Sequence, residues 1–88
     1  MNAARRQEII EIIEQLQSIK TDIEAAKDAL DSVADEEKEA FDNMPEGPQS
    51  SYRGQRMEEG IEAMQTASSD LEDIDIDAII EALEEVMT

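Results

Sequence analysis

Apolar residues recur along the first half of the chain in alternating steps of three and four. The series is interrupted only by the charged Glu37, and its members are Ile9, Ile12, Leu16, Ile19, Ile23, Ala26, Leu30, Val33 and Ala40. This spacing places one apolar stripe along a helix and is typical of coiled coils and helical bundles. We predict a helix over 3–43, capped at its start by Asn2. It should end before Pro45, because a proline disfavours helical geometry in the residue that precedes it.

The second half of the chain carries a similar pattern with less regular spacing. Its apolar positions are Met57, Ile61, Met64, Ala67 or Ser68, Leu71, Ile74, Ile79 or Ile80, Leu83 and Met87. We predict a second helix over 51–87, opened by Pro48 or Ser51 and weakened in its first turns by two glycines. The phase of the pattern changes within DIDIDAII. We therefore also predict a break in this helix near 73–77.

A short corner, residues 44–50, contains both prolines and joins the two predicted helices. These elements predict an all-α fold, a single antiparallel helical hairpin of coiled-coil type over 1–88. Four apolar residues lie beside the two stripes rather than in them: Ile10, Ile13, Phe41 and Ile79. At about 25 cal/mol per Å² of apolar surface, leaving them in water would forfeit roughly a few kcal/mol, a large part of a small domain's stability. We therefore predict that hairpins associate into a four-helix bundle dimer or a higher oligomer.

The charge of the chain is strongly one-sided. It contains 24 acidic and seven basic residues, for a net charge of −17, and no basic residue follows Arg56. Such a charge disfavours binding to nucleic acid or to an anionic membrane and favours binding to a basic protein surface. Histidine and cysteine are absent, which removes the commonest general base and thiolate chemistry. We predict a non-enzymatic protein with no catalytic residue, metal or cofactor. The sequence shows no signal peptide and no membrane-spanning run, so we expect a cytoplasmic location.

The acidic residues of the second half form the first candidate site. We expect eight of them to contact a partner: Glu58, Glu59, Glu62, Asp70, Glu72, Asp73, Asp75 and Asp77. Carboxylates along a rigid helical rod can imitate the anionic surface of duplex DNA and occupy the basic cleft of a DNA-binding protein. Two simpler roles explain the same charge, namely solubility alone or adaptation to a salt-loving host whose proteins are acidic throughout.

Residues 73–84, DIDIDAIIEALE, align with a calcium-binding loop through three aspartates and Glu84. The sixth position of such a loop requires glycine for a sharp turn, and this chain has Ala78 there. The isoleucines between the aspartates suit the buried side of a helix better than a solvated loop. We therefore favour an exposed acidic helix over a calcium site.

Two acidic motifs, EEGIE at 58–62 and EDID at 72–75, resemble the magnesium-binding helices of all-helical nucleotide pyrophosphatases of the MazG type. The gap between the motifs is shorter than in that family. No basic residue after Arg56 is present to receive the phosphates. We therefore do not predict this activity.

An aromatic and two basic residues stand together where the second helix should begin. Tyr52, Arg53 and Arg56 could hold a carboxylate or phosphate with arginine side chains and the N–H groups of a helix start. In the simpler interpretation, which we favour, the arginines neutralise nearby acidic residues such as Asp42 or Glu58. Tyr52 then covers the end of the core.

The segment 35–64, DEEKEAFDNMPEGPQSSYRGQRMEEGIEAM, resembles small uncharacterised proteins encoded by bacteriophages and prophages, mostly of Gram-positive bacteria. In those proteins an aromatic residue precedes DNMPE, and a serine, an Arg-Gly pair and an acidic helix follow. This chain departs from the pattern in GPQ after Pro-Glu and in YRGQR around Arg-Gly. The resemblance implies a phage origin, and thus the cytoplasm of an infected or lysogenic bacterial host as the location. It also implies a small acidic binder that antagonises a host protein. It assigns no functional residue.

Three functions are consistent with these features. The first is a phage-type binding protein whose acidic surface docks on and inhibits a basic host protein, a defence or nucleic-acid-handling factor, by DNA mimicry. The second is a structural or assembly component of a virion or scaffold. The third is an oligomer that binds a small anionic ligand through the arginines of the corner.

Overall fold

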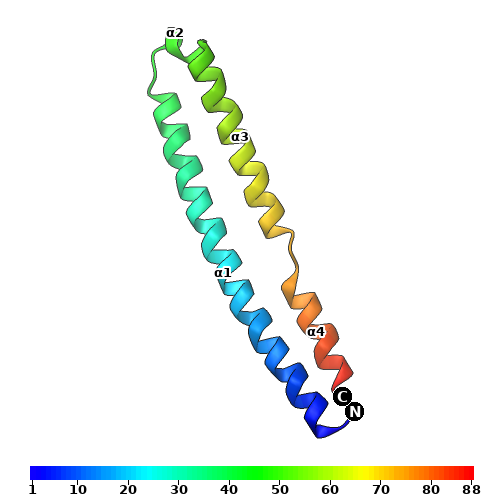
Figure 1. Cartoon of the computed structure of the whole chain (residues 1–88). Helices are drawn as coiled ribbons and strands as arrows, with labels where there is room; N and C mark the ends of the chain where they lie inside the picture. Colours follow the sequence, from blue (N-terminus) through cyan, green and yellow to red (C-terminus); the bar gives the residue numbers. More distant parts are fainter.

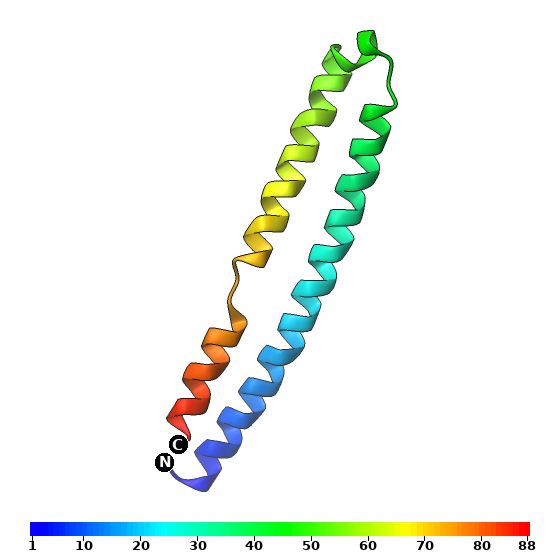
Figure 2. The same cartoon turned by 180° about the vertical axis from the view of Figure 1, so that it is seen from behind.

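The computed structural model describes residues 1–88 and shows a long antiparallel hairpin built of helices alone (Figure 1). Helix α1 spans Ala3–Asp42 and forms one arm, and the short helix α2, Glu46–Gln49, lies at the corner. Helices α3, Tyr52–Glu72, and α4, Ile76–Val86, return along α1. The molecule measures 68 × 15 × 14 Å, and both termini lie together at the open end (Figure 2). The predicted all-α hairpin is confirmed.

Helix α1 begins and ends close to the predicted residues. The side chain of Asn2 caps it, because its Oδ1 accepts a hydrogen bond of 2.9 Å from the Arg5 backbone N–H. The last helical residue is Asp42 rather than residue 43, and Asn43 occupies the position after it. The N-cap satisfies one of the backbone donors that a helix start leaves unpaired.

The corner contains a helical turn, α2, where the sequence predicted only a reversal. Pro45 precedes this turn and Pro48 lies within it. A proline fits the first turn of a helix, where the missing N–H has no partner to lose. The Gln49 side chain closes the corner by donating a 2.9 Å hydrogen bond from Nε2 to the Phe41 carbonyl oxygen near the end of α1. The prolines therefore build the reversal as well as end α1.

Helix α3 starts at a tight junction with α2. Ser51 is its N-cap: Oγ accepts a 3.3 Å hydrogen bond from the Gly54 N–H and donates one of 2.5 Å to the Pro48 carbonyl oxygen. Gly54 is buried, and a Cβ atom there would lie 2.1 Å from the Gln49 carbonyl oxygen. The sequence predicted that this glycine weakens the start of the helix, and the structure gives it a second role. It permits the close approach of α3 to α2.

The side of α1 that faces the returning helices differs from the predicted stripe. The inward residues are buried or half-buried and follow steps of four and three: Ile9, Ile13, Leu16, Lys20, Ile23, Lys27, Leu30, Ala34, Glu37 and Phe41. The seam and the predicted stripe share Ile9, Leu16, Ile23 and Leu30, which are seven residues apart. The inward residues that alternate with these four lie one position after the residues predicted there. Ile13 is 8% exposed, whereas the predicted Ile12 is 45% exposed. Ile13 and Phe41 thus belong to the seam, while Ile10 and Ile79 lie outside it, as predicted.

Two lysines explain why the apolar pattern misplaced the seam. Lys20 and Lys27 occupy inward positions of α1 and are half-buried. A lysine can cover apolar surface with its methylene stem while its ammonium group reaches a carboxylate at the edge. A prediction based on apolar residues alone places lysines on the outer side of a helix. The predicted stripe therefore contained the neighbouring row, which includes Ile12, Ile19 and Val33, in place of the row that contains the lysines.

The returning arm has an interrupted seam. Its inward residues are Gly54, Met57, Ile61, Met64, Ser68 and Leu71 on α3, then Ile76, Ile80, Leu83 and Met87 from α4 onward. This arrangement selects Ser68 over Ala67 and Ile80 over Ile79, and it contradicts the predicted inward position of Ile74, which is 46% exposed. The largest cluster of buried side chains, Ile13, Ile76 and Ile80, lies toward the open end.

The break between α3 and α4 resets the phase of the seam. Leu71 and Ile76 are five residues apart, whereas an unbroken heptad helix allows steps of three or four only. A continuous helix would bring Asp75 inward, four residues after Leu71. The chain leaves helical geometry after Glu72 instead, and Asp75 caps α4 by accepting a 3.0 Å hydrogen bond from the Ala78 N–H. The predicted break is confirmed.

Candidate functional site

One side of the hairpin carries a row of shallow hollows lined with carboxylates. The hollows have volumes of about 310, 430 and 490 Å³ and lie near the corner, at the α3–α4 break and toward the open end. We call their acidic residues the acidic face: Glu24, Asp42, Glu58, Glu62, Glu72, Asp73, Asp75, Asp77, Glu81 and Glu84. All of them are exposed. The face combines α1 with both returning helices.

The structure gathers six of the eight predicted contact residues on the acidic face. The other two, Glu59 and Asp70, are exposed but do not line these hollows. Sequence reasoning missed four members of the face: Glu24, Asp42, Glu81 and Glu84. A sequence signal for several of them exists, because acidic residues directly follow inward apolar residues in the pairs Ile23-Glu24, Met57-Glu58, Leu71-Glu72, Ile76-Asp77 and Leu83-Glu84.

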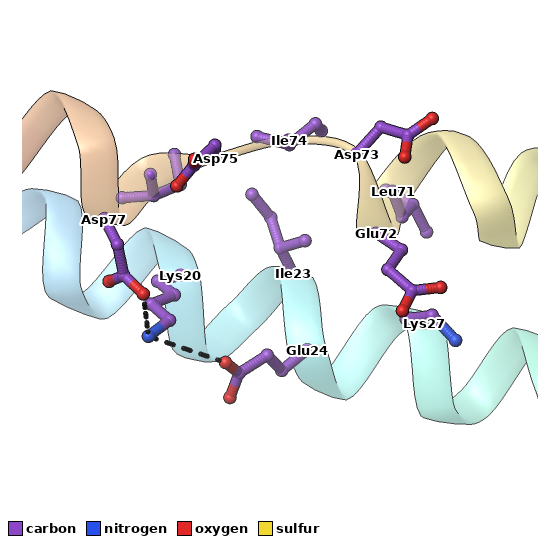
Figure 3. A pocket seen from close by; sticks show the side chains of 11 residues that line it. Lys20, Ile23, Glu24, Lys27, Leu71, Glu72, Asp73, Ile74, Asp75 and Asp77 are labelled. Carbon is purple, nitrogen blue, oxygen red and sulfur yellow. Dashed lines mark hydrogen bonds and ion pairs between the residues drawn. The ribbon is translucent and has the colours of Figure 1, made fainter.

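Lys20 ties α4 to α1 at the edge of the acidic face. Its Nζ donates a 2.9 Å hydrogen bond to Asp77 Oδ2 and lies 4.0 Å from Glu24 Oε1 (Figure 3). The hydrogen bond to Asp77 and its negative charge raise the pKa of Lys20 above the ordinary value. Figure 3 also shows Ile23 pointing from α1 toward the segment between α3 and α4. Lys20 and Ile23 of α1 thus lie against the returning arm next to its non-helical segment between α3 and α4.

Lys27 and Asp31 form a second charged cluster between α1 and α3. Lys27 Nζ donates a 2.9 Å hydrogen bond to Asp31 Oδ2, and the hydroxyl of buried Ser68 donates to Asp31 Oδ1. The Ser68 hydrogen bond, followed by that of Lys27, lowers the pKa of Asp31, and the bond to Asp31 raises the pKa of Lys27. The one buried hydroxyl of the seam is thereby satisfied.

Most carboxylates of the chain remain without a cation. Only Glu24, Asp31 and Asp77 lie within 4.0 Å of a lysine or arginine nitrogen, among 24 acidic residues. The internal ion pairs use two lysines for the packing of the hairpin, and the rest of the acidic face has no ion pair within 4.0 Å, although Lys38 lines the hollow near the corner. The negative field of the acidic face therefore extends into solvent.

The arginines of the corner do not behave as the simpler interpretation predicted. Neither Arg53 nor Arg56 lies within 4.0 Å of an acidic oxygen. Tyr52 is 76% exposed and does not cover the core. The structure thus shows no ion pair for either arginine and contradicts the packing role of Tyr52, and binding of an anionic ligand there stays a prediction.

The segment that aligned with a calcium loop does not form a loop. Residues 76–84 are helical, with Ile76 and Ile80 in the core. Asp75 and Asp77 of that segment serve the α4 cap and the pair with Lys20. No three acidic residues of the chain lie close enough together to hold a metal ion. The two acidic motifs at 58–62 and 72–75 therefore form no such group either.

The opposite side of the hairpin is apolar. On α1 a row with a seven-residue repeat lies one position before every second inward residue, namely Ile13, Lys20, Lys27, Ala34 and Phe41, and equivalent rows run along α3 and α4. We call these nine residues the apolar face: Ile12, Ile19, Ala26, Val33, Ala40, Gly60, Ala67, Ile79 and Val86. In an antiparallel pair of helices these rows meet on one side, while the positions following the inward apolar residues meet on the other. The face therefore lies opposite to the acidic one.

Comparisons of the chain with protein-family models, curated proteins and solved structures found no match. None of the four helices contains an apolar stretch of the length that a membrane crossing takes. The class of protein is thus defined by its shape and surfaces: an all-helical hairpin with an acidic face and an apolar face on opposite sides.

Proposed function

We propose that the chain is a non-enzymatic binding protein that docks its acidic face on a basic surface of a host protein and blocks it. The observation that carries the proposal is the gathering of ten exposed carboxylates on one side of a long hairpin, only two of them paired with a cation. A basic surface with several lysines or arginines would gain attraction from the whole row. The resemblance of the corner to phage proteins favours a bacterial target.

The charge density of the rod supports a target that handles nucleic acid. The chain carries 17 net negative charges along 68 Å, about one per 4 Å. Duplex DNA carries about one charge per 1.7 Å and each strand about one per 3.4 Å. A single hairpin therefore approaches the charge density of one strand, and two hairpins side by side, at about one charge per 2 Å, approach that of a duplex. The proposal accordingly includes self-association into a four-helix bundle or a higher oligomer.

Affinity capture from a bacterial lysate tests the proposal when two charge-matched variants are compared. The first changes four glutamates of the acidic face to glutamine: Glu58, Glu62, Glu72 and Glu84. The control changes four glutamates that lie at outward positions of the helices, off both faces: Glu11, Glu39, Glu59 and Glu85. Both variants have the same net charge, so only the position of the carboxylates differs.

We expect the wild type and the control to retain a basic partner, and the acidic-face variant to lose at least about tenfold in captured amount. Capture should also weaken steeply between about 50 and 300 mM salt, since exposed charges are screened over a Debye length of about 10 Å at 0.1 M. An equal loss of captured partner in both variants would show that binding depends on the net charge of the chain and not on the position of the carboxylates. A partner held equally at all salt concentrations would contradict the proposal.

A structural role in a virion or scaffold is the second candidate, and the exposed apolar face favours it. A surface of this kind marks a site of protein association. Light scattering over a concentration series separates the two functions. Growth into large assemblies without any captured host protein would favour the structural role.

A further inference from the structure

We infer that the apolar face packs against the apolar face of a second copy in antiparallel orientation, giving a four-helix bundle with an acidic face on each outer side. This inference rests on the self-association proposed above and names the surface and the geometry that produce it. It does not depend on the identity of any host partner.

The exposed large apolar residues are concentrated on this face. Five of the nine such residues in the chain belong to it: Ile12, Ile19, Val33, Ile79 and Val86. Ile19 is 46% exposed and Ile79 is 50% exposed, although both lie within well-formed helices. Their seven-residue repeat matches the spacing by which helices pack in bundles. The hairpin alone leaves this second seam without a partner.

The exposed area of the chain matches what a dimer would cover. A compact monomer of this mass, 9.8 kDa, exposes about 5,200 Å². This hairpin exposes 6474 Å², an excess of about 1,300 Å² over the compact monomer. A standard protein interface buries about 800 Å² on each partner, and obligate homodimers bury more. Covering one long side of the rod would remove an area of this size.

The occupant that fits best is a second copy of the chain. The face runs along α1 from Ile12 to Ala40, about 42 Å at 1.5 Å per residue, so its partner must be a long rod with the same repeat, and a two-fold pair supplies it. Acidic residues such as Glu8, Asp22 and Glu36 border the face on α1 and would repel an anionic membrane. The pairing also places the two acidic faces on opposite outer sides, where their repulsion is smallest.

The distribution of side-chain size along the face sets the orientation. Lys20 lies opposite Asp77 and Asp31 opposite Ser68, so the same register places Ile12 level with Val86 and Ala40 level with Gly60. The open end of the face is therefore bulky and the corner end is small. Well-packed interfaces set large residues against small ones. Antiparallel hairpins set Ile12 and Val86 against Ala40 and Gly60, whereas parallel hairpins would leave a gap at the corner end.

Sedimentation equilibrium of the purified chain tests the pairing without any partner. We expect a dimer whose dissociation constant rises at least about 100-fold in Ile19→Asp and in Ile79→Asp, because each change places two charges in the symmetric interface. The control Ile10→Asp, an exposed isoleucine off the face, should dimerise as the wild type does. Added salt should strengthen the dimer by screening the repulsion between two chains of charge −17, which is opposite to the effect expected on capture of a basic partner.

Single cysteines test the orientation, since the chain has none of its own. Under an added oxidant, Ile12→Cys and Ala40→Cys should each stay monomeric on a denaturing gel, and an equimolar mixture should give a linked dimer. Self-linking of Ala40→Cys alone would overturn the antiparallel arrangement. A wild type that sediments as a monomer at about 100 μM in 0.5 M salt, or equal weakening by Ile10→Asp, would overturn the pairing itself. Should an aspartate variant lose helical circular dichroism, the milder pair Ile19→Ala and Ile79→Ala decides the question, because neither side chain belongs to the core of the hairpin.

Discussion

The junction of α2 and α3 makes a sharp prediction about two glycines of the corner. A Cβ atom at Gly54 would lie 2.1 Å from the Gln49 carbonyl oxygen and 2.6 Å from that of Pro48. Both neighbours are backbone atoms, so relief of the clash requires the corner to open. At Gly47 the same added atom meets nothing within 4 Å. No glycine of the chain has positive φ, so the difference between these two positions is steric and does not depend on left-handed backbone.

The expected magnitudes follow from two opposing effects. Replacing a helical glycine by alanine stabilises by about 0.5–1 kcal/mol when the added methyl group is unobstructed. Forcing atoms into filled space costs about 1–3 kcal/mol. Gly47→Ala should therefore be neutral or stabilising, and Gly54→Ala should lower the free energy of unfolding by about 1–2 kcal/mol. In a chain of this size, 1 kcal/mol shifts the melting temperature by about 4–8 °C.

Thermal and urea unfolding followed by circular dichroism at 222 nm measures both variants at one protein concentration. The concentration must be equal, because association adds to apparent stability. We expect Gly54→Ala to melt below the wild type and Gly47→Ala at or above it. Equal melting temperatures for the two variants would show that α3 does not approach α2 as closely as the structure indicates.

Two further predictions concern the seam. The lowered pKa of Asp31 means that its hydrogen bonds stabilise the fold fully above its ordinary pKa of 3.8 and that this stabilisation is lost as the pH falls through the lower folded value. Ser68→Ala should therefore flatten the fall of melting temperature below about pH 4, whereas Ser69→Ala, at an exposed neighbour, should not. Ile80→Ala should lower the free energy of unfolding by about 2–4 kcal/mol because Ile80 is in the core, and Ile10→Ala by less than about 1 kcal/mol. Similar losses from both isoleucines in urea unfolding would place the core elsewhere.

The sequence predicted the elements of the hairpin well because local signals mark their ends. Residue type predicts Asn2 as the cap of the first helix and either Pro48 or Ser51 as the start of the second, and the side chains of Asn2 and Ser51 accept hydrogen bonds from the helices that they precede. The change of apolar phase within DIDIDAII predicted the break before Ile76. These features depend on neighbours within a few residues, so a single sequence contains the information.

The rotation of α1 about its axis could not be read from the same pattern. Ile12 and Ile13 are equally apolar, and each continues a regular series with Ile9 and Leu16. Which of the two isoleucines faces inward depends on the side chains that the returning helices place against α1. Asp77 on α4 receives the ammonium group of Lys20, and Ser68 on α3 donates a hydrogen bond to Asp31, the α1 residue that pairs with Lys27, so these lysines turn inward.

The rotation of α1 about its axis also determined which residues form the two exposed sides of the hairpin. The amino-acid sequence by itself determined the helices, their caps, the reversal, the break and the excess of negative charge, because each follows from residue type and short-range spacing. Only the tertiary structure divided the remaining residues into an acidic face and an apolar face. The division arises because two neighbouring helices leave two sides uncovered, and a shift of the seam by one position moves a whole row of isoleucines and valine from the core to the surface.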